Sequence, residues 1–248
     1  MRRIDLNCDL GEGAGHDAAL MPLITSANIA CGAHAGDEAT MRATVALAQQ
    51  HGDAIGAHPG LADRANFGRV ERPVSPGEVH GLVHDQVLQL QLLTRAAGAR
   101  LVHVKAHGAL YNMAAREPLL ARAVVDAIYE VDPRLILFGL AGSHLIAAAE
   151  ACGLPVASEV FADRTYQADG ALTPRSQPNA LIADEAAAVA QVLRMVGEGK
   201  VRATDGTVVA IRADTVCLHG DGAHPVEFAR RLRQELTAAG VGIRACGA

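Results

Sequence analysis

Short apolar segments alternate with longer segments of helical periodicity along almost the whole chain. Apolar runs of four or five residues, bounded by polar residues or glycine, are typical of strands that are buried on both faces. We expect seven such strands, at Ile4–Cys8, Ala27–Cys31, Ala54–Ala57, Leu101–Lys105, Leu135–Gly139, Pro155–Glu159 and Thr215–His219. Buried strands separated by helices predict a parallel sheet covered by helices.

The segments between these strands carry the start and stop signals of helices. Ser75 and Glu78 form a capping-box pattern with proline at the first turn, and apolar residues then recur at helical spacing until Gly98 ends the run. Further helices are predicted from near Asp37 to Gly52, from near Pro118 to before Pro133, and at Ser143–Gly153, Asp184–Gly197 and Pro225–Gly240. Residues 199–212 differ, because an Asp-Gly pair between two strand-like runs predicts a hairpin, which we interpret as a surface insertion.

This pattern predicts an α/β fold in a single domain over residues 1–248. The length and the seven strand–helix units suit a closed, seven-stranded parallel barrel similar to a TIM barrel. A doubly wound open sheet is the alternative. The barrel is favoured by the positions of the polar residues described below.

Composition excludes several classes of protein. Half of the residues are hydrophobic and 20% are charged, which excludes a disordered chain. A net charge of −5 without a basic run argues against nucleic acid as a partner. Five widely spaced cysteines do not suggest a disulfide framework. The most apolar stretch, residues 135–142, is too short to span a membrane, and the N-terminus does not resemble a signal peptide, so we expect a soluble cytoplasmic protein.

Polar residues gather where the predicted strands end. The C-terminal ends of parallel strands meet on one face, which is where the active sites of such folds form. Buried charges are costly unless they are paired, so a repeated placement of this kind indicates a functional site. The residues are Asp5, Asn7, Asp9, Glu12, Asn28, His34, Asp37, His58, Lys105, His107, Tyr111, Asn112, Glu159, Asp163, Arg164, Tyr166, His219 and Asp221.

Several of these residues have a simpler interpretation when they are taken singly. Asp9 or Asp37 alone is more typical of a helix or turn cap than of a catalyst, and His58 can bond within a turn. Lys105 can form a salt bridge at the barrel rim, although a charge that closes an apolar strand is costly. The remaining histidines, including His103, are interpreted as surface or packing residues, and the cysteines in strands as small hydrophobes.

The sequence contains neither a phosphate-binding loop of the G-x-x-x-x-G-K-[ST] type nor a G-x-S-x-G nucleophile elbow. Aspartate and histidine at strand ends could hold a divalent metal with open positions. The candidates are scattered along the chain, so the sequence leaves open which of them converge.

Six motifs, in order from Ile4 to the last helix, resemble the LamB/YcsF family. They are residues 5–12 (DLNCDLGE), 28–37 (NIACGAHAGD), 56–59 with 67–69 (GAHP, FGR), 104–112 (VKAHGALYN), 159–166 (EVFADRTY) and 217–221 (CLHGD). The chain departs from the family pattern at Ala106, where the family often has proline, and at Val70, where it often has a second arginine. Neither change removes a group that carries chemistry.

The resemblance implies a seven-stranded barrel similar to the glycoside hydrolase and deacetylase superfamily. It also implies ATP-dependent ring opening of 5-oxo-L-proline to L-glutamate, as one component of a 5-oxoprolinase that contains subunits B and C. ATP is then the expected cofactor, a divalent metal is possible, and no membrane or nucleic acid is involved. Phosphorylation of the amide oxygen would activate the stable lactam toward water, which needs a base and groups that steady negative charge.

Roles for the polar residues follow as hypotheses. The expected catalytic residues are Lys105, His107, His58, His219, Asp221 and Asp9. The expected substrate-binding residues are Asn7, Asn28, His34, Tyr111, Arg164 and Tyr166. Candidate metal ligands are Asp5, Asp9, Glu12, His58 and Asp163.

Two other functions remain open. The same barrel could be an independent metal-dependent amidohydrolase or deacetylase, which would bind metal tightly and act without ATP. It could also be a binding subunit that only captures 5-oxoproline for its partners, which would tolerate substitution of its histidines and aspartates. The missing phosphate loop keeps the second alternative open, because partner subunits could handle ATP.

Overall fold

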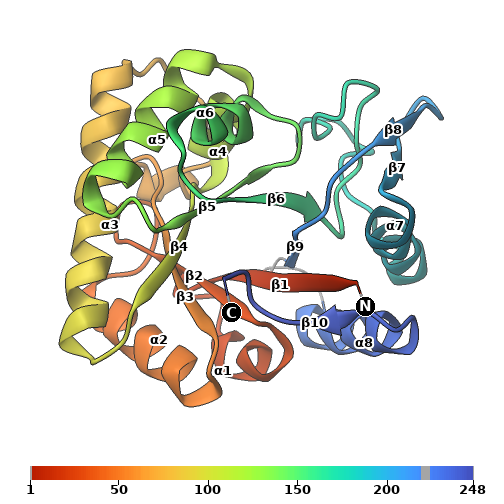
Figure 1. Ribbon diagram of the computed structural model, residues 1–248, viewed down its shortest axis with the longest axis horizontal. Coiled ribbons are helices and arrows are strands. Elements are labelled where there is room, and N and C mark those ends of the chain that lie inside the picture. Colours follow the sequence, from red (N-terminus) through yellow and green to blue (C-terminus); the bar gives the residue numbers. More distant parts are fainter. Residues whose placement is uncertain (1, 219–223, 248) are drawn as a thin grey trace.

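The parallel sheet closes into a seven-stranded barrel, as predicted, and the open doubly wound alternative is wrong (Figure 1). The computed structural model describes residues 2–218 and 224–247. The barrel strands are β1 (Arg3–Leu10), β2 (Ser26–Ala30), β3 (Ala54–His58), β4 (Leu101–Lys105), β5 (Ile136–Leu140), β6 (Val156–Phe161) and β9 (Thr215–Leu218). They pair in this order, and β9 pairs with β1 to close the barrel.

Helices surround this barrel on the outside. They are α1 (Asp17–Leu20), α2 (Glu38–His51), α3 (Pro76–Ala96), α4 (Gly108–Arg116), α5 (Pro118–Val131), α6 (His144–Cys152), α7 (Glu185–Glu198) and α8 (Pro225–Ala238), with short 3-10 turns at Met21–Leu23 and Arg64–Asn66. Asp37 caps α2 by accepting a 2.8 Å hydrogen bond from the backbone N–H of Thr40, so its simpler interpretation as a cap is confirmed. Ser75 caps α3 in the same way.

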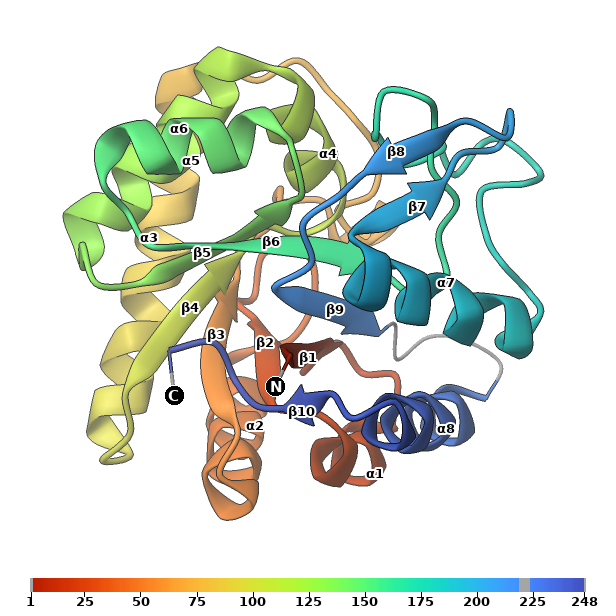
Figure 2. The same ribbon diagram turned by 45° about the vertical axis from the view of Figure 1, so that its right-hand side comes forward.

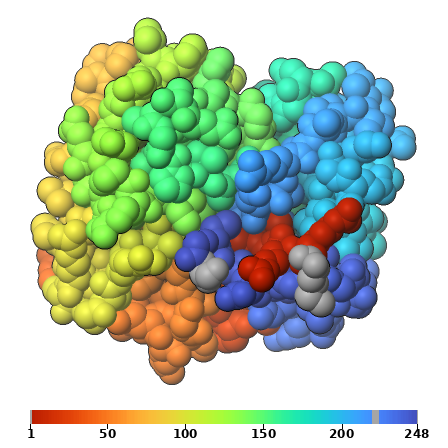
Figure 3. Space-filling view, viewed as in Figure 1, coloured from red at the N-terminus to blue at the C-terminus, as the bar shows by residue number. Residues whose placement is uncertain are grey.

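The sequence analysis missed two helices, the short α1 and α4, and one strand. Helix α4 begins at Gly108, whose φ of +53° suits glycine, and the predicted helix at Pro118 follows it almost directly. Strand β10 (Gly242–Ile243) lies parallel to the start of β1, so a C-terminal segment lies beside an N-terminal one in the space-filling view (Figure 3). The predicted hairpin is present as β7 (Lys200–Arg202) and β8 (Val208–Ala210), beside α7 (Figure 2).

The barrel interior is polar because side chains alternate along each strand. In β1, Leu6, Cys8 and Leu10 are buried in the hydrophobic core, whereas Asp5, Asn7 and Asp9 form hydrogen bonds with residues of other barrel strands. The apolar layer between sheet and helices therefore stabilises the fold. The polar positions are left for a site inside the barrel.

One carboxylate outside the site predicts a measurable pH dependence of stability. Burial raises the pKa of Asp53 to about 7, Arg233 opposes the shift and Asp5 adds to it, and one carboxylate oxygen of Asp53 has no hydrogen-bond partner among the described residues. Because the folded-state pKa exceeds the unfolded value of about 3.9, the stability that depends on Asp53 is lost as pH rises from about 4 to 7.

We expect Asp53→Asn to raise the free energy of unfolding at pH 8 by about 1 kcal/mol, after allowance for solvent screening of this partly exposed group. The gain should disappear at pH 4, where the carboxyl is protonated in the folded protein. Urea unfolding of both proteins at the two pH values measures it. A gain that is equal at both pH values would contradict the assignment.

Candidate functional site

Lys105 lies at the centre of the polar interior. It ends β4 and is 3% exposed. Its Nζ lies 2.9 Å from an Asp9 oxygen, 3.0 Å from a Glu159 oxygen, 3.2 Å from the Asn7 amide oxygen and 3.1 Å from the Cys217 sulfur. Burial lowers the pKa of Lys105, but Asp9 and the other acceptors outweigh it and hold this pKa well above its usual value. Lys105 is therefore a buried ammonium, and its positive charge is shared between two carboxylates.

Glu159 is held from the other side of this ion pair. The Tyr111 hydroxyl donates a 2.7 Å hydrogen bond to one of its oxygens, and the Asn7 amide donates a 3.0 Å bond to the other. Burial and the neighbouring Glu159 raise the pKa of Tyr111 well above its usual value, so the hydroxyl keeps its proton and remains a donor. The sequence analysis named Glu159 among the strand-end residues but gave it no role.

A chain of hydrogen bonds fixes the orientation of Asp9. The Asn28 amide nitrogen donates 2.8 Å bonds to Asp9 and Asn7, so its oxygen must be the acceptor for the 2.7 Å bond with His103 Nε2. Burial lowers the pKa of His103 to about 3, which keeps the ring neutral with its proton on Nε2. His103 is thus a packing residue, buried and stacked on Phe138, and it also forms a hydrogen bond that the sequence analysis did not predict.

This chain of bonds predicts different costs for two substitutions of His103. His103→Leu leaves the buried Asn28 oxygen without a donor, which should cost about 1–3 kcal/mol of unfolding free energy. His103→Gln keeps an N–H donor on a side chain of similar reach and should cost clearly less. Urea denaturation of the two variants checks this, and equal losses would contradict the hydrogen-bond role.

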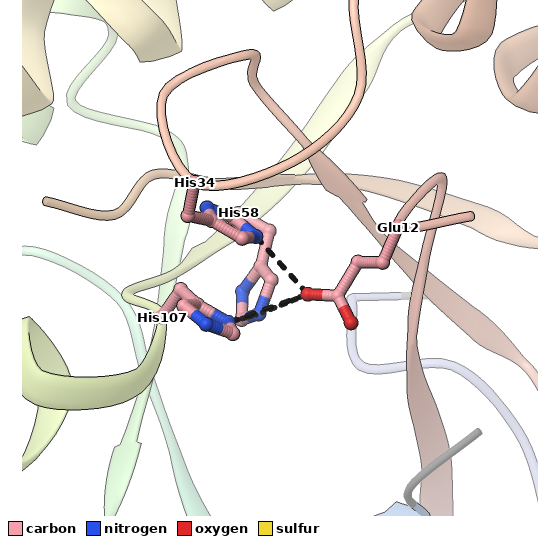
Figure 4. A group of neighbouring side chains, drawn as sticks. All are labelled: Glu12, His34, His58 and His107. Carbon is pink, nitrogen blue, oxygen red and sulfur yellow. Dashed lines mark hydrogen bonds and ion pairs between the residues drawn. The ribbon is translucent and has the colours of Figure 1, made fainter. Parts of the chain in front are cut away.

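Four side chains next to Asp9 bring their ligand atoms together. Glu12, His34, His58 and His107 place one oxygen or nitrogen each within 4.8 Å of all the others, and three of the four are fully buried (Figure 4). Glu12 extends from the loop after β1 toward imidazoles that come from the ends of β2, β3 and β4. This donor set fits a divalent cation, as neutral imidazoles and a carboxylate are its usual ligands.

The rings in this cluster differ in protonation. Burial lowers the pKa of His34 to about 3, and burial together with His58 does the same for His107. Burial also lowers the pKa of His58, but Asp9, 3.3 Å away, and Glu12 reverse the direction and raise it overall. The cluster therefore holds at least two neutral imidazoles available as ligands.

A cavity of about 290 Å³ opens above this network at the C-terminal ends of the strands. Its lining includes Asp9, His58, Lys105, His107, Tyr111 and Arg164. Its described lining carries five cationic side chains and two carboxylates, the cations being Arg69, Lys105, Arg116, Arg164 and Arg175. An anionic ligand is favoured there.

The structure brings most of the predicted site residues together. Asn7, Asp9, Asn28, Lys105 and Tyr111 belong to the network, and Glu12, His34, His58 and His107 to the cluster. Arg164 lines the cavity, held by the backbone carbonyls of Thr173 at 2.6 Å and Ala180 at 3.3 Å. His219 and Asp221 lie outside the described residues.

Three predicted residues lie apart. Asp5, a candidate metal ligand, is buried nearer the start of β1, where the hydroxyls of Thr25, Ser26 and Thr215 bond to it. Asp163 is not a member of the metal-ligating cluster. Tyr166, expected to bind substrate, is fully buried and accepts a 2.8 Å hydrogen bond from the Phe161 backbone N–H, which holds the end of β6.

Sequence reasoning missed the arginines of the cavity mouth. Arg69, Arg116 and Arg175 line the cavity but come from loops and a helix end rather than from strand ends. The only signal was Arg69 in the FGR motif. Arg116 is paired with Glu71 at 2.9 Å, so its charge is shared with a carboxylate that also lines the cavity.

Comparison with known proteins identifies the family of this chain. Residues 4–248 match the LamB/YcsF family along nearly the whole chain. The chain belongs to the LamB/YcsF family. Relatives named as the A subunit of 5-oxoprolinase are 57% identical in Geobacillus kaustophilus and 54% identical in Bacillus subtilis, each over 99% of this chain and 97% of the relative. The relationship spans these relatives almost from end to end.

Two solved structures are similar to this chain in fold. A lactam utilization protein from Thermus thermophilus is 45% identical, with a TM-score of 0.92 over 98% of this chain and 100% of that one. A peptidoglycan N-acetylglucosamine deacetylase domain from Eubacterium rectale is 12% identical, with a TM-score of 0.54 over 100% and 89% of the two chains, and shares the fold. Within the described residues, no helix is both long and apolar enough to cross a membrane.

Proposed function

We propose that this chain opens the ring of 5-oxo-L-proline to L-glutamate in an ATP-dependent reaction, as the A subunit of a cytoplasmic 5-oxoprolinase that also contains subunits B and C. The observation that carries the proposal is the Asp9–Lys105–Glu159 network, whose Asp9 and Lys105 line a cation-rich cavity. The names of its relatives support the same substrate, since they are 5-oxoprolinase subunits and a lactam utilization protein.

The cavity suits a small lactam that carries a carboxylate. Its volume of about 290 Å³ admits a five-membered ring with its substituents. Arg164 is 4% exposed, and two backbone carbonyls fix its guanidinium at the cavity wall. A planar guanidinium held in this way binds a carboxylate through paired hydrogen bonds, so Arg164 is assigned to the substrate carboxylate. An uncharged sugar amide lacks the negative charge that makes this contact strong.

Asp9 is the assigned general base. One of its oxygens accepts bonds from Lys105 and Asn28, and the other lies 3.3 Å from His58 Nε2. It lines the cavity and stays ionised beside the ammonium. Asp9 takes a proton from the attacking water, whose oxygen bonds to the lactam carbonyl carbon. The ring C–N bond then breaks, and the leaving nitrogen receives a proton to become the amine of glutamate.

ATP supplies the driving force, because a five-membered lactam resists hydrolysis. Transfer of the terminal phosphoryl group to the amide oxygen gives an activated species. Attack of a first water and cleavage of the ring C–N bond leave an acyl phosphate, and a second water releases the phosphate, so the balance is lactam, ATP and two waters to glutamate, ADP, phosphate and a proton. We assign nucleotide handling mainly to the partner subunits, since the chain contains no phosphate loop. Glu12, His34, His58 and His107 would hold a divalent cation, which supplies Lewis-acid polarisation when bound.

The deciding experiment measures ADP and glutamate formed from ATP and 5-oxo-L-proline. The chain is assayed alone and with co-expressed subunits B and C. We expect both products only in the mixture, in equal amounts. Glutamate formation by the chain alone without ATP would favour an independent amidohydrolase. If a complex that is shown to assemble forms neither ADP nor glutamate, the proposal is overturned.

Substitution of Asp9 separates a catalytic subunit from one that only binds. Asp9→Asn should abolish glutamate formation in the complex, because an amide cannot take the proton from water. If this chain only captures 5-oxoproline, Asp9→Asn should retain turnover, which would contradict the assignment of Asp9.

A further inference from the structure

Two imidazoles of the cluster face each other through nitrogens that carry no proton when both rings are neutral. His58 Nδ1 lies 2.7 Å from the Lys105 backbone carbonyl, and His107 Nε2 lies 2.8 Å from the Phe67 backbone carbonyl. A carbonyl only accepts, so each of these nitrogens holds the proton of its ring. The remaining two, His58 Nε2 and His107 Nδ1, are 2.9 Å apart. At this distance the two nitrogens need a positive centre between or beside them, which a proton on one ring or a bound cation supplies.

Glu12 and His34 complete the surroundings of this centre. The Glu12 carboxylate oxygen lies 3.3 Å from His107 Nδ1, 3.8 Å from His58 Nε2 and 3.0 Å from His34 Nε2. Ligands bound tetrahedrally at about 2.0–2.1 Å are separated by roughly 3.3 Å, so the spacings around the Glu12 oxygen lie close to those of a tetrahedral metal site. Ring N–H groups bonded to backbone carbonyls are also the usual support of metal-binding histidines.

The loop after β3 holds the cluster in this arrangement. Phe67, whose φ of +55° is unusual for a residue other than glycine, directs its carbonyl at His107, and its ring lies edge-on to His34 and His107. A Cβ on Gly60 would lie 2.7 Å from His34 Nδ1, so the backbone approaches the ring closely. Backbone strain of this kind is concentrated at functional sites, so it supports a functional role for the cluster.

We propose that Glu12, His34, His58 and His107 bind one resident transition-metal ion of the class that prefers imidazole, such as Zn²⁺ or Co²⁺. Mg²⁺ prefers carboxylates and water, so this ion is distinct from the one that accompanies ATP. The role of the ion beside Asp9 rests on the proposed function, whereas its binding does not.

The test is metal binding by the full chain, without substrate. After treatment with a chelator and desalting, the chain is dialysed against Zn²⁺, Co²⁺ or Mg²⁺ at micromolar concentration, and bound metal is measured by mass spectrometry. We expect one Zn²⁺ or Co²⁺ per chain, no Mg²⁺, a visible absorption band for Co²⁺ and a higher melting temperature with Zn²⁺. Glu12→Gln and His34→Gln should lose the bound ion and the thermal shift.

The control is His80→Gln, which alters a surface pair formed by His80 and Glu130, 3.2 Å apart, and should keep one ion. Glu12→Gln is the milder cluster variant, as its side chain is 10% exposed, and circular dichroism confirms folding. No bound Zn²⁺ or Co²⁺, equal binding of Mg²⁺, or binding that survives in folded Glu12→Gln would overturn the proposal. Metal binding without coupled turnover would instead count against the lactam function alone.

Discussion

Replacing Lys105 with methionine is expected to lower coupled glutamate formation by about 10²–10³-fold, the usual loss when one preorganised charged donor is removed from a reaction centre. The ammonium holds Asp9 at 2.9 Å and Glu159 at 3.0 Å inside the barrel. Without it, Asp9 loses the partner that fixes its carboxylate in the position assigned to the base. The assay is ADP and glutamate formation with subunits B and C present.

A loss of stability must be separated from this loss of chemistry. Removing one partner of a buried ion pair leaves an uncompensated charge and costs about 3–5 kcal/mol. The double variant Lys105→Met with Glu159→Gln removes one of the two stranded carboxylates, so its melting temperature should rise above that of the single variant. Its activity should stay low. Recovery of activity together with stability would show that Lys105 only supports the fold.

The sequence offers a matched control for this experiment. The chain has only two lysines, Lys105 and Lys200, and Lys200 is exposed at the start of β7. Lys200→Met should retain full turnover and stability. The chain otherwise carries its positive charge on arginine, and a lysine at the centre of the barrel suits a compact ammonium that four acceptors surround.

The barrel could be predicted because its signals are local. Apolar runs, caps and glycines mark each strand and helix, and Asp37 and Ser75 cap their helices as expected. Polar residues at strand ends also marked the face of the site. This rule fails for Asp5, because alternation places every second residue of β1 inside the barrel, including one far from the cavity.

The pairing inside the barrel could not be read from the sequence. His103 is one residue of a strand, and only the register of β2, β4 and β5 brings Asn28 and Phe138 to its ring. The grouping of the arginines at the cavity mouth could not be predicted for the same reason. Segments that follow different strands place these arginines together. Long-range register and loop conformation therefore decide which of the polar residues meet.

Gly56→Ala is expected to destabilise the protein by about 3 kcal/mol or more, at the upper end of the cost of overpacking a core. A Cβ at Gly56 would overlap three atoms of the His103 ring, closer than non-bonded atoms can approach. The ring cannot move away, because it stacks on Phe138 at 4.1 Å and bonds to Asn28. The register between β3 and β4 also shifts beside Gly56. Urea unfolding of the soluble variant, or its yield, measures the loss.

A second substitution tests the cause of that loss. In the double variant Gly56→Ala with His103→Ala the colliding ring is absent, so the protein should be more stable than Gly56→Ala alone, although below wild type because of the cavity and the unpaired Asn28 oxygen. Gly81→Ala, in helix α3 where an added Cβ meets nothing, is the control and should be neutral or stabilising. If the double variant is no better than Gly56→Ala, the backbone at Gly56 requires glycine for another reason. If it recovers, the contact between Gly56 and His103 is what allows an imidazole to lie beneath Asn28 and orient Asp9.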